Sequence, residues 1–164
     1  MIQNNYGYES QRGVPGGLVD SSPRSIISRA NGEATPVKFG YGVVCGGKPG
    51  VDVKLPVATS EADSFEGIVM ADIAERDING AVANNPTRML GILEWGKAWV
   101  RVADSLTIAY GQQVYLITKG DDVGKFTNDD DGGDNLAING RFIGAVDSGD
   151  IAPVKLYNAP CAEE

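Results

Sequence analysis

The sequence predicts an all-β fold, either an antiparallel β-sandwich or a partly closed barrel, with an extended N-terminal arm in front of it. Three observations lead to this prediction. From Val37 onward, short apolar stretches are separated about every ten residues by Gly, Pro, Asn or Asp, as in many-stranded antiparallel proteins. Several of these stretches alternate apolar and polar residues. No segment keeps apolar residues at i, i+3, i+4 and i+7 for long, so we expect very little helix.

The expected arm covers residues 1–31, and the expected β-rich domain covers residues 32–164. The arm range is rich in glycine and proline and has few regularly spaced apolar side chains. Such a terminus is either frayed or ordered against a partner, and the sequence leaves both possibilities open. Within this range only the end near Ile26 and Ile27 is expected to pack.

Basic residues outnumber acidic ones in the arm range, although the whole chain is acidic. Arg12, Arg24 and Arg29 stand against Glu9 and Asp20. A locally basic segment suits contact with an acidic protein surface at least as well as contact with nucleic acid. The three arginines are therefore the candidate residues for binding a partner.

Two segments of the expected domain show the period-two alternation of half-buried strands. In residues 51–57 the valines and the leucine alternate with Asp52, Lys54 and Pro56. In residues 97–102 the three aliphatic side chains would face inward, and Trp99 would lie on the outer face. Further strands are expected at residues 43–45, 65–73, 89–94, 114–118, 141–146 and 151–157. A helical turn is expected at most in residues 60–65 and 72–82.

Composition excludes several classes of function. The chain has 164 residues, a formal net charge of −8 and no histidine. Without histidine there is no Ser-His-Asp or Cys-His catalytic arrangement and no His-ligated zinc. The negative charge disfavours nucleic acid as a partner, because binding to phosphates needs clustered Lys and Arg. The two cysteines, Cys45 and Cys161, are interpreted as structural or incidental.

Nothing in the sequence predicts a membrane partner or export. No apolar run approaches the ~20 residues that cross a bilayer. The first residues have neither the basic start nor the apolar stretch of a signal peptide. We therefore expect a soluble protein that is made in a cytoplasm.

The clearest polar cluster, residues 129–134, has four aspartates and two glycines. Hard oxygen ligands in a flexible loop suit calcium, but the ligand spacing, central glycine and final Glu of an EF-hand are absent. The glycine-rich stretches at residues 13–17 and 40–50 also lack the pattern of a phosphate-binding loop. We interpret the acidic cluster as a solvated hairpin tip and the glycines as turns. No catalytic residue, metal ligand or cofactor site is predicted.

Five phrases together resemble one family, the cement or head decoration proteins of tailed-bacteriophage capsids. They are Phe39-Gly-Tyr-Gly-Val-Val44, Phe65-Glu-Gly-Ile-Val69, Gly96-Lys-Ala-Trp-Val-Arg-Val102, Gly111-Gln-Gln-Val-Tyr115 and Ile151-Ala-Pro-Val-Lys-Leu156. Their order and spacing are similar to that family over nearly all of residues 37–157.

The resemblance implies a structural, non-enzymatic virion protein that binds the outer capsid surface and stabilises joints between major capsid subunits. It implies the major capsid protein as the partner, self-association with a trimer favoured, and no cofactor, nucleic acid or membrane. Synthesis in the host cytoplasm and assembly onto the virion follow from the same resemblance. Multivalent attachment would let weak individual contacts hold collectively.

Two other functions stay open at this point. A carbohydrate-binding or fibre-associated virion module would use exposed aromatic residues, and Trp95 and Trp99 in a concave groove would favour it. A carboxylate-based glycosidase would need two facing acids roughly 5 to 9.5 Å apart in a cleft, and the sequence shows no recognisable pair.

Overall fold

Two closed rings of strands that share one long strand make up the architecture. The computed structural model describes residues 13–73, 76, 78–81 and 84–158, without the side chains of residues 147–149. In these residues the strands are β1 Ser25–Asn31, β2 Gly42–Cys45, β3 Asp52–Lys54, β4 Phe65–Val69, β5 Met89–Ile108, β6 Gln113–Leu116, β7 Phe126–Thr127, β8 Leu136–Phe142 and β9 Val146–Leu156. The described residues also include the 3-10 turns η1 Ala62–Ser64 and η3 Asp131–Gly133. The all-β prediction is confirmed.

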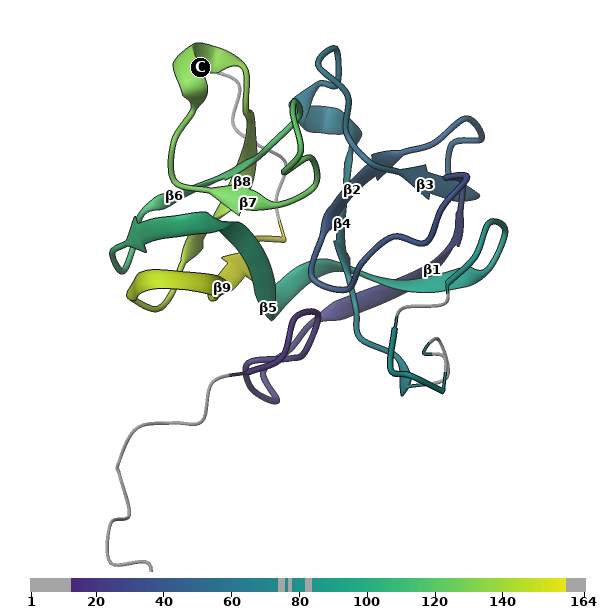
Figure 1. Ribbon diagram of the computed structural model, residues 1–164, viewed down its shortest axis with the longest axis horizontal. Helices are drawn as coiled ribbons and strands as arrows, with labels where there is room; N and C mark the ends of the chain where they lie inside the picture. The colour runs from purple at the N-terminus through teal and green to yellow at the C-terminus, as the bar shows by residue number, and fades with distance from the viewer. Residues whose placement is uncertain (1–12, 74–75, 77, 82–83, 159–164) are drawn as a thin grey trace, which may run out of the picture.

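Strand pairing explains how the rings close. The first ring runs β1-β3-β2-β4-β5 and returns to β1, and the second runs β5-β7-β6-β8-β9 and returns to β5. Figure 1 shows the second ring on the left and the first on the right, with β5 passing from one to the other. Closure pairs the edges that an open sheet would expose. Most pairs are antiparallel, as predicted, and the short β1–β3 and β5–β7 pairs are parallel.

Strand β5 replaces two strands that the sequence predicted separately, residues 89–94 and 97–102. Gly96 lies between them with a φ of 128°, a conformation that residues with a Cβ rarely adopt. The ladder nevertheless continues through it, since Trp95 pairs with Ser25 of β1 and Gly96 pairs with Leu156 of β9. The glycine therefore turns the strand from one ring into the other without ending it.

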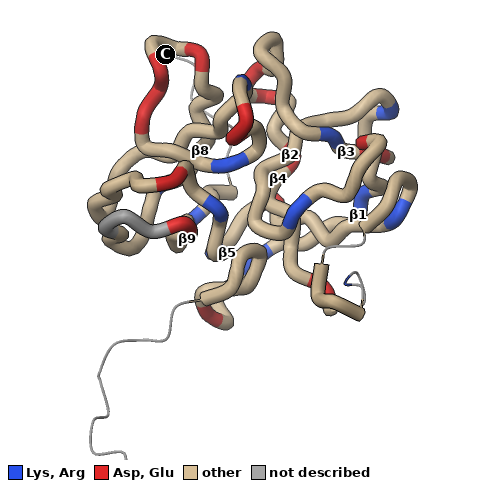
Figure 2. The backbone as a smooth tube through the Cα atoms, in the orientation of Figure 1, with Lys and Arg blue, Asp and Glu red and all other residues tan. Residues whose placement is uncertain are grey.

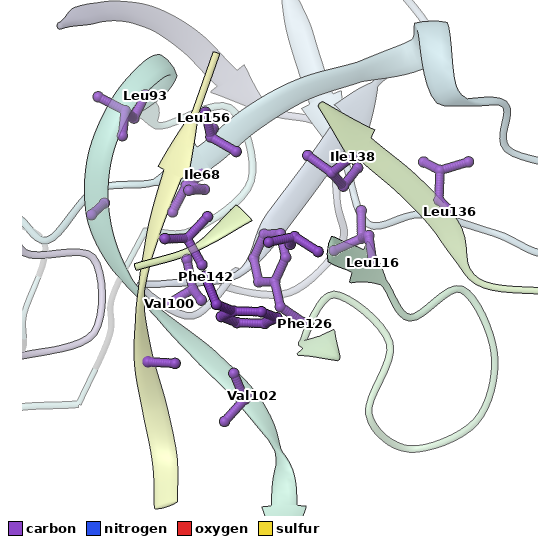
Figure 3. Packing of buried hydrophobic residues seen from close by; sticks show 14 of the residues in the cluster. Ile68, Leu93, Val100, Val102, Leu116, Phe126, Leu136, Ile138, Phe142 and Leu156 are labelled. Atoms are coloured by element: carbon purple, nitrogen blue, oxygen red, sulfur yellow. The ribbon is translucent and has the colours of Figure 1, made fainter. Parts of the chain in front are cut away.

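The core follows the period-two pattern where the strands are long. Ala98, Val100 and Val102 are fully buried, as predicted, together with Phe126 and Phe142. Figure 3 shows the Phe126 and Phe142 side chains among aliphatic side chains from both rings of strands. A second buried cluster lies in the first ring: Val37, Phe39, Tyr41, Val43, Val53, Val69, Leu90 and Ile92.

One predicted strand is shorter than expected. The alternation in residues 51–57 predicted a continuous apolar face, but β3 covers only Asp52–Lys54. Val53 is fully buried, whereas Val51 is 55% exposed and Val57 is 47% exposed. Both exposed valines lie beyond the short pairing of β3 with β1 and β2, so alternation alone overestimated the buried face.

Residues 25–31, inside the range expected for the arm, form β1. This strand pairs along β5 from Ser25 to Ala30 and joins β3 at its end. Ile27 packs on the second core cluster, while Ile26 is 46% exposed. The division into an arm and a domain stays a prediction, and any arm that acts independently of the sheet has to lie before β1.

Candidate functional site

The described part of the N-terminal segment, residues 13–20, lies along β5. The Gly16 amide donates to the Trp99 carbonyl at 2.8 Å, and the Trp99 amide donates to the Gly17 carbonyl at 2.8 Å. A bridge between Leu18 and Ala98 continues this pairing. Since β9 pairs with the other edge of β5 here, residues 97–99 are held on both sides.

Glycine is required where this segment crosses the strand. A Cβ on Gly13 would collide with the indole of Trp99, which is partly buried beneath it. Gly16 has a φ of 75°, and a Cβ there would lie 2.6 Å from the Ala71 backbone nitrogen. The glycines at residues 13–17, interpreted from sequence as turns, therefore also permit a close backbone approach.

An ion pair fixes the far end of the segment. The Lys97 ammonium lies 2.7 Å from the Asp20 carboxylate, which also accepts a hydrogen bond from the Ser22 amide at 2.9 Å. The hydrogen bond from Lys97 is the largest cause that holds the pKa of Asp20 well below its ordinary range, and Ser22 contributes next. Asp20 thus stays charged at any pH near neutrality.

The three candidate arginines have different surroundings. Arg12 lies outside the described residues. Arg24 is exposed just before β1, and its guanidinium donates to the Ser22 carbonyl at 3.4 Å. Arg29 lies in β1 with its Nε 3.5 Å from a Glu66 carboxylate oxygen. Glu66 partly neutralises the charge of Arg29. Of these two arginines, Arg24 should therefore attract an acidic partner more strongly.

A basic pocket of about 450 Å³ lies where the N-terminal segment, the start of the domain and β5 meet. Its lining is Pro15, Pro36, Lys38, Phe39, Arg76, Gly80, Ala81 and Arg101, so three cations and no described acid line it. The Arg76 guanidinium lies over the Phe39 ring at 5.0 Å and donates to the Gly80 carbonyl at 2.7 Å. The buried Nε of Arg101 has no hydrogen-bond partner.

Sequence reasoning missed this pocket because its cations come from three distant segments. The alternation in residues 97–102 implies that Arg101 shares the outer face with Trp99, and this alternation is the available signal. It could not show that Lys38 and Arg76 lie beside Arg101. The pocket could accept an anionic group, because three cations and no described acid line it.

The acidic loop between β7 and β8 uses its carboxylates locally. The Asp130 side chain accepts from the Gly132 amide at 3.2 Å, and the Asp129 side chain accepts from the Asp131 amide at 3.1 Å. Asp134 pairs with Lys119 at 2.7 Å. Figure 2 shows this loop at the upper left, with its acidic residues in red. Across the described ranges no three acidic, His or Cys side chains are grouped to hold a metal ion.

The surroundings of the two tryptophans do not match a carbohydrate-binding groove. Trp95 packs against the main core, and Trp99 contacts Gly13 of the N-terminal segment. The pKa of the Asp20 carboxyl group is lowered, opposite to the raised pKa that the general acid of a glycosidase needs. Neither alternative function gains support from these positions.

The family model described as "Structural cement protein (E217 gp24/Pam3 gp6)" matches residues 2–157. A solved chain from "The capsid of Myoviridae Phage XM1" is similar in fold, with a TM-score of 0.70 and 17% identity over 96% of this chain and 98% of that one. No curated protein matches. In the part of the chain that is described, no helix has the length and apolar character to cross a bilayer.

The family match covers nearly the whole chain and includes both rings, the shared strand and the docked N-terminal segment. The all-β architecture agrees with the fold of the capsid chain. The five phrases that suggested a family from sequence alone all lie within the matched residues. The chain therefore belongs to the structural cement protein family of bacteriophages.

Proposed function

We propose that this structural virion protein binds the outer surface of a tailed-phage capsid and strengthens the joints between its major capsid subunits. The observation that carries the proposal is the family match over residues 2–157. The closed rings support it, because a protein that reinforces a shell needs a rigid body without exposed strand edges. We propose no catalytic activity and no cofactor.

The finer parts of the proposal concern assembly. The protein self-associates, with a trimer favoured, and attaches through several equivalent contacts. Multivalent attachment would make the assembled protein bind more tightly than one copy. The protein is made in the host cytoplasm and joins the virion afterwards. Arg12, Arg24 and Arg29 are the proposed arm contacts, with Arg24 contributing more than Arg29 because Glu66 pairs with the latter.

The decisive experiment adds purified protein to undecorated shells and separates bound from free protein by sedimentation. Saturable binding, with a copy number in fixed ratio to the major capsid protein, supports the proposal. No binding to the shells refutes it. Analytical ultracentrifugation of the free protein tests self-association, and a monomer at every concentration that binds shells would contradict the trimer.

Two variants test the arm without removing described structure. Deletion of residues 1–12 leaves the pairing of residues 16–19 with β5 intact, whereas deletion of residues 1–31 would remove β1 from the sheet. Arg24→Glu reverses one exposed charge, and Lys48→Glu reverses another in the turn before β3 as a matched control. Weaker binding by the first two variants, with the control unchanged, supports the arm contacts.

A further inference from the structure

Three neighbouring strands place three cations in one row on the outer face of the second ring. Arg141 of β8 is directly opposite Lys155 of β9, and Lys155 is directly opposite Lys97 of β5. The next register pairs, Phe142 with Val154 and Val154 with Ala98, are buried in the core. Because side chains alternate between faces, the three cations must share the outer face.

Such a row is unfavourable for the isolated fold. Directly opposite side chains on paired strands have Cβ atoms about 4.5–5.5 Å apart, and like charges at that spacing destabilise the pair. The row contains two such pairs side by side. We name it the cation row, defined by Arg141, Lys155 and Lys97.

One of the three cations has a compensating carboxylate. Lys97 pairs with Asp20 at 2.7 Å. Arg141 lies over the Tyr110 ring at 5.5 Å and Lys155 lies over the Tyr157 ring at 5.6 Å. No ion pair between described residues includes Arg141 or Lys155. The buried Nε of Arg141 has no hydrogen-bond partner.

We propose that the cation row docks a carboxylate-bearing segment of the shell protein. The inference rests on the proposed function, and charge complementarity identifies the occupant. An acidic segment would supply the negative charge that no described residue provides to Arg141 and Lys155, and it would reduce their mutual repulsion. Tyr110 is 64% exposed and Tyr157 is 37% exposed, so each uncompensated cation is flanked by an aromatic ring. Tyrosine and arginine are enriched at the centres of protein interfaces.

A protein segment fits this surface better than a nucleic acid does. The row is only three cations wide, and Asp20 borders it at β5. The chain as a whole carries a net charge of −8, which repels an extended polyanion. A short acidic segment can contact the row without approaching the remaining acidic surface.

The test variant is Arg141→Gln with Lys155→Gln, which removes both uncompensated charges but keeps long polar side chains. Its matched control is Lys48→Gln with Lys119→Gln, which makes the same change in net charge at two exposed lysines outside both the row and the basic pocket. We measure the affinity of each protein for undecorated shells at several salt concentrations, together with its thermal unfolding. The single variants Arg141→Gln and Lys155→Gln are measured as well.

We expect the test variant to bind shells about tenfold more weakly than the unchanged protein, and we expect its affinity to depend less on salt concentration. Its melting temperature should be unchanged or higher, since the like-charge repulsion is gone. The control should keep near-normal affinity. If the test variant melts at a lower temperature than the unchanged protein, the single variant with the higher melting temperature replaces it. Normal binding by that single variant overturns the proposal.

The other outcomes distinguish a failure of the docking inference from a failure of the proposed function. If the unchanged protein does not bind shells, both the proposed function and this inference fail. If it binds and the test variant binds equally well, the cement function stands and the row is not its docking surface. Equal weakening in test and control variants would mean a general charge effect and would also overturn the row. A DNA duplex that binds the unchanged protein but not the test variant would replace the acidic segment by a phosphate ligand.

Discussion

The contact between the two rings can be tested at Gly42, where β2 of the first ring meets β6 and β7 of the second. A Cβ on Gly42 would collide with Leu116 Cδ1 and would lie 2.8 Å from Phe126 Cζ. Leu116 and Phe126 are both fully buried, so neither side chain can swing into solvent. Overpacking of this kind costs about 1–3 kcal/mol. Gly42→Ala should therefore reduce the free energy of unfolding by about that amount.

The second substitution removes the Leu116 atoms that come closest to the new Cβ. Leu116→Ala deletes both Cδ atoms and should cost about 2–5 kcal/mol on its own, from lost burial and the cavity left behind. In the double variant the new Cβ at residue 42 occupies part of that cavity, which leaves Phe126 Cζ as the remaining close contact and gives its ring room to shift. The double variant should thus lose less stability than the sum of the two single variants, by about 1 kcal/mol or more.

Urea unfolding followed by circular dichroism measures these differences. With a slope of about 1–3 kcal/mol/M, a loss of 2 kcal/mol moves the midpoint by about 1 M. Gly91→Ala is the matched control, because the nearest atoms to its Cβ would be 3.7 Å away, in ordinary contact. It should be neutral or slightly stabilising. Additive losses within about 0.5 kcal/mol, or no cost for Gly42→Ala, would refute the close packing of the rings at this point.

Three further predictions concern the N-terminal segment and the acidic loop. Gly13→Val should lift the segment from the tryptophan that it covers and shift the indole fluorescence to longer wavelength, with the β spectrum unchanged; an unshifted emission would contradict the close approach. In an NMR titration the Asp20 carboxyl should remain charged below the ordinary value of about 3.9, because its pKa is lowered. The ion pair between Asp20 and Lys97 should therefore stabilise the fold above that value and lose its effect as the pH falls through the lowered pKa. Lys97→Gln should raise the pKa of Asp20, and an unchanged pKa would exclude the ion pair in solution. Asp130→Asn with Asp131→Asn should leave the protein folded, and calcium should not raise its melting temperature; a calcium-dependent rise abolished by these substitutions would indicate a metal site.

The fold class was predictable because the evidence for it is local. The alternation in residues 97–102 placed three aliphatic side chains inward, and all three are buried. Turn residues placed most strand boundaries within a few positions. The sequence predicted separate strands at residues 89–94 and 97–102, because a local pattern cannot show that one strand continues through Gly96 with its neighbours on both sides paired.

The ring closures and the candidate surfaces were not predictable, because they depend on pairing between distant residues. Lys97, Arg141 and Lys155 are unremarkable in sequence, and only the register of three strands brings them into one row. The basic pocket likewise needs Lys38, Arg76 and the outer face of β5 together. The arm arginines were found by local composition, and that method could not detect Glu66 beside Arg29.

The shared strand also bears on how this protein would hold a shell. β5 carries the docked N-terminal segment, one cation of the row and Arg101 of the basic pocket. Its backbone is paired on both sides at residues 97–99, and at residue 101 it pairs with β9 and donates to the Gly40 carbonyl at 3.0 Å. Side chains on such a backbone are already positioned before a partner arrives, so less conformational entropy is lost on binding than for a segment that must order. Arg141 of β8 and Lys155 of β9 also lie on backbone that is paired on both sides. We therefore expect Arg141→Gln with Lys155→Gln to weaken attachment more than deletion of residues 1–12 does. The opposite order of effects would mean that attachment depends chiefly on the terminal residues rather than on the preformed surface of the second ring.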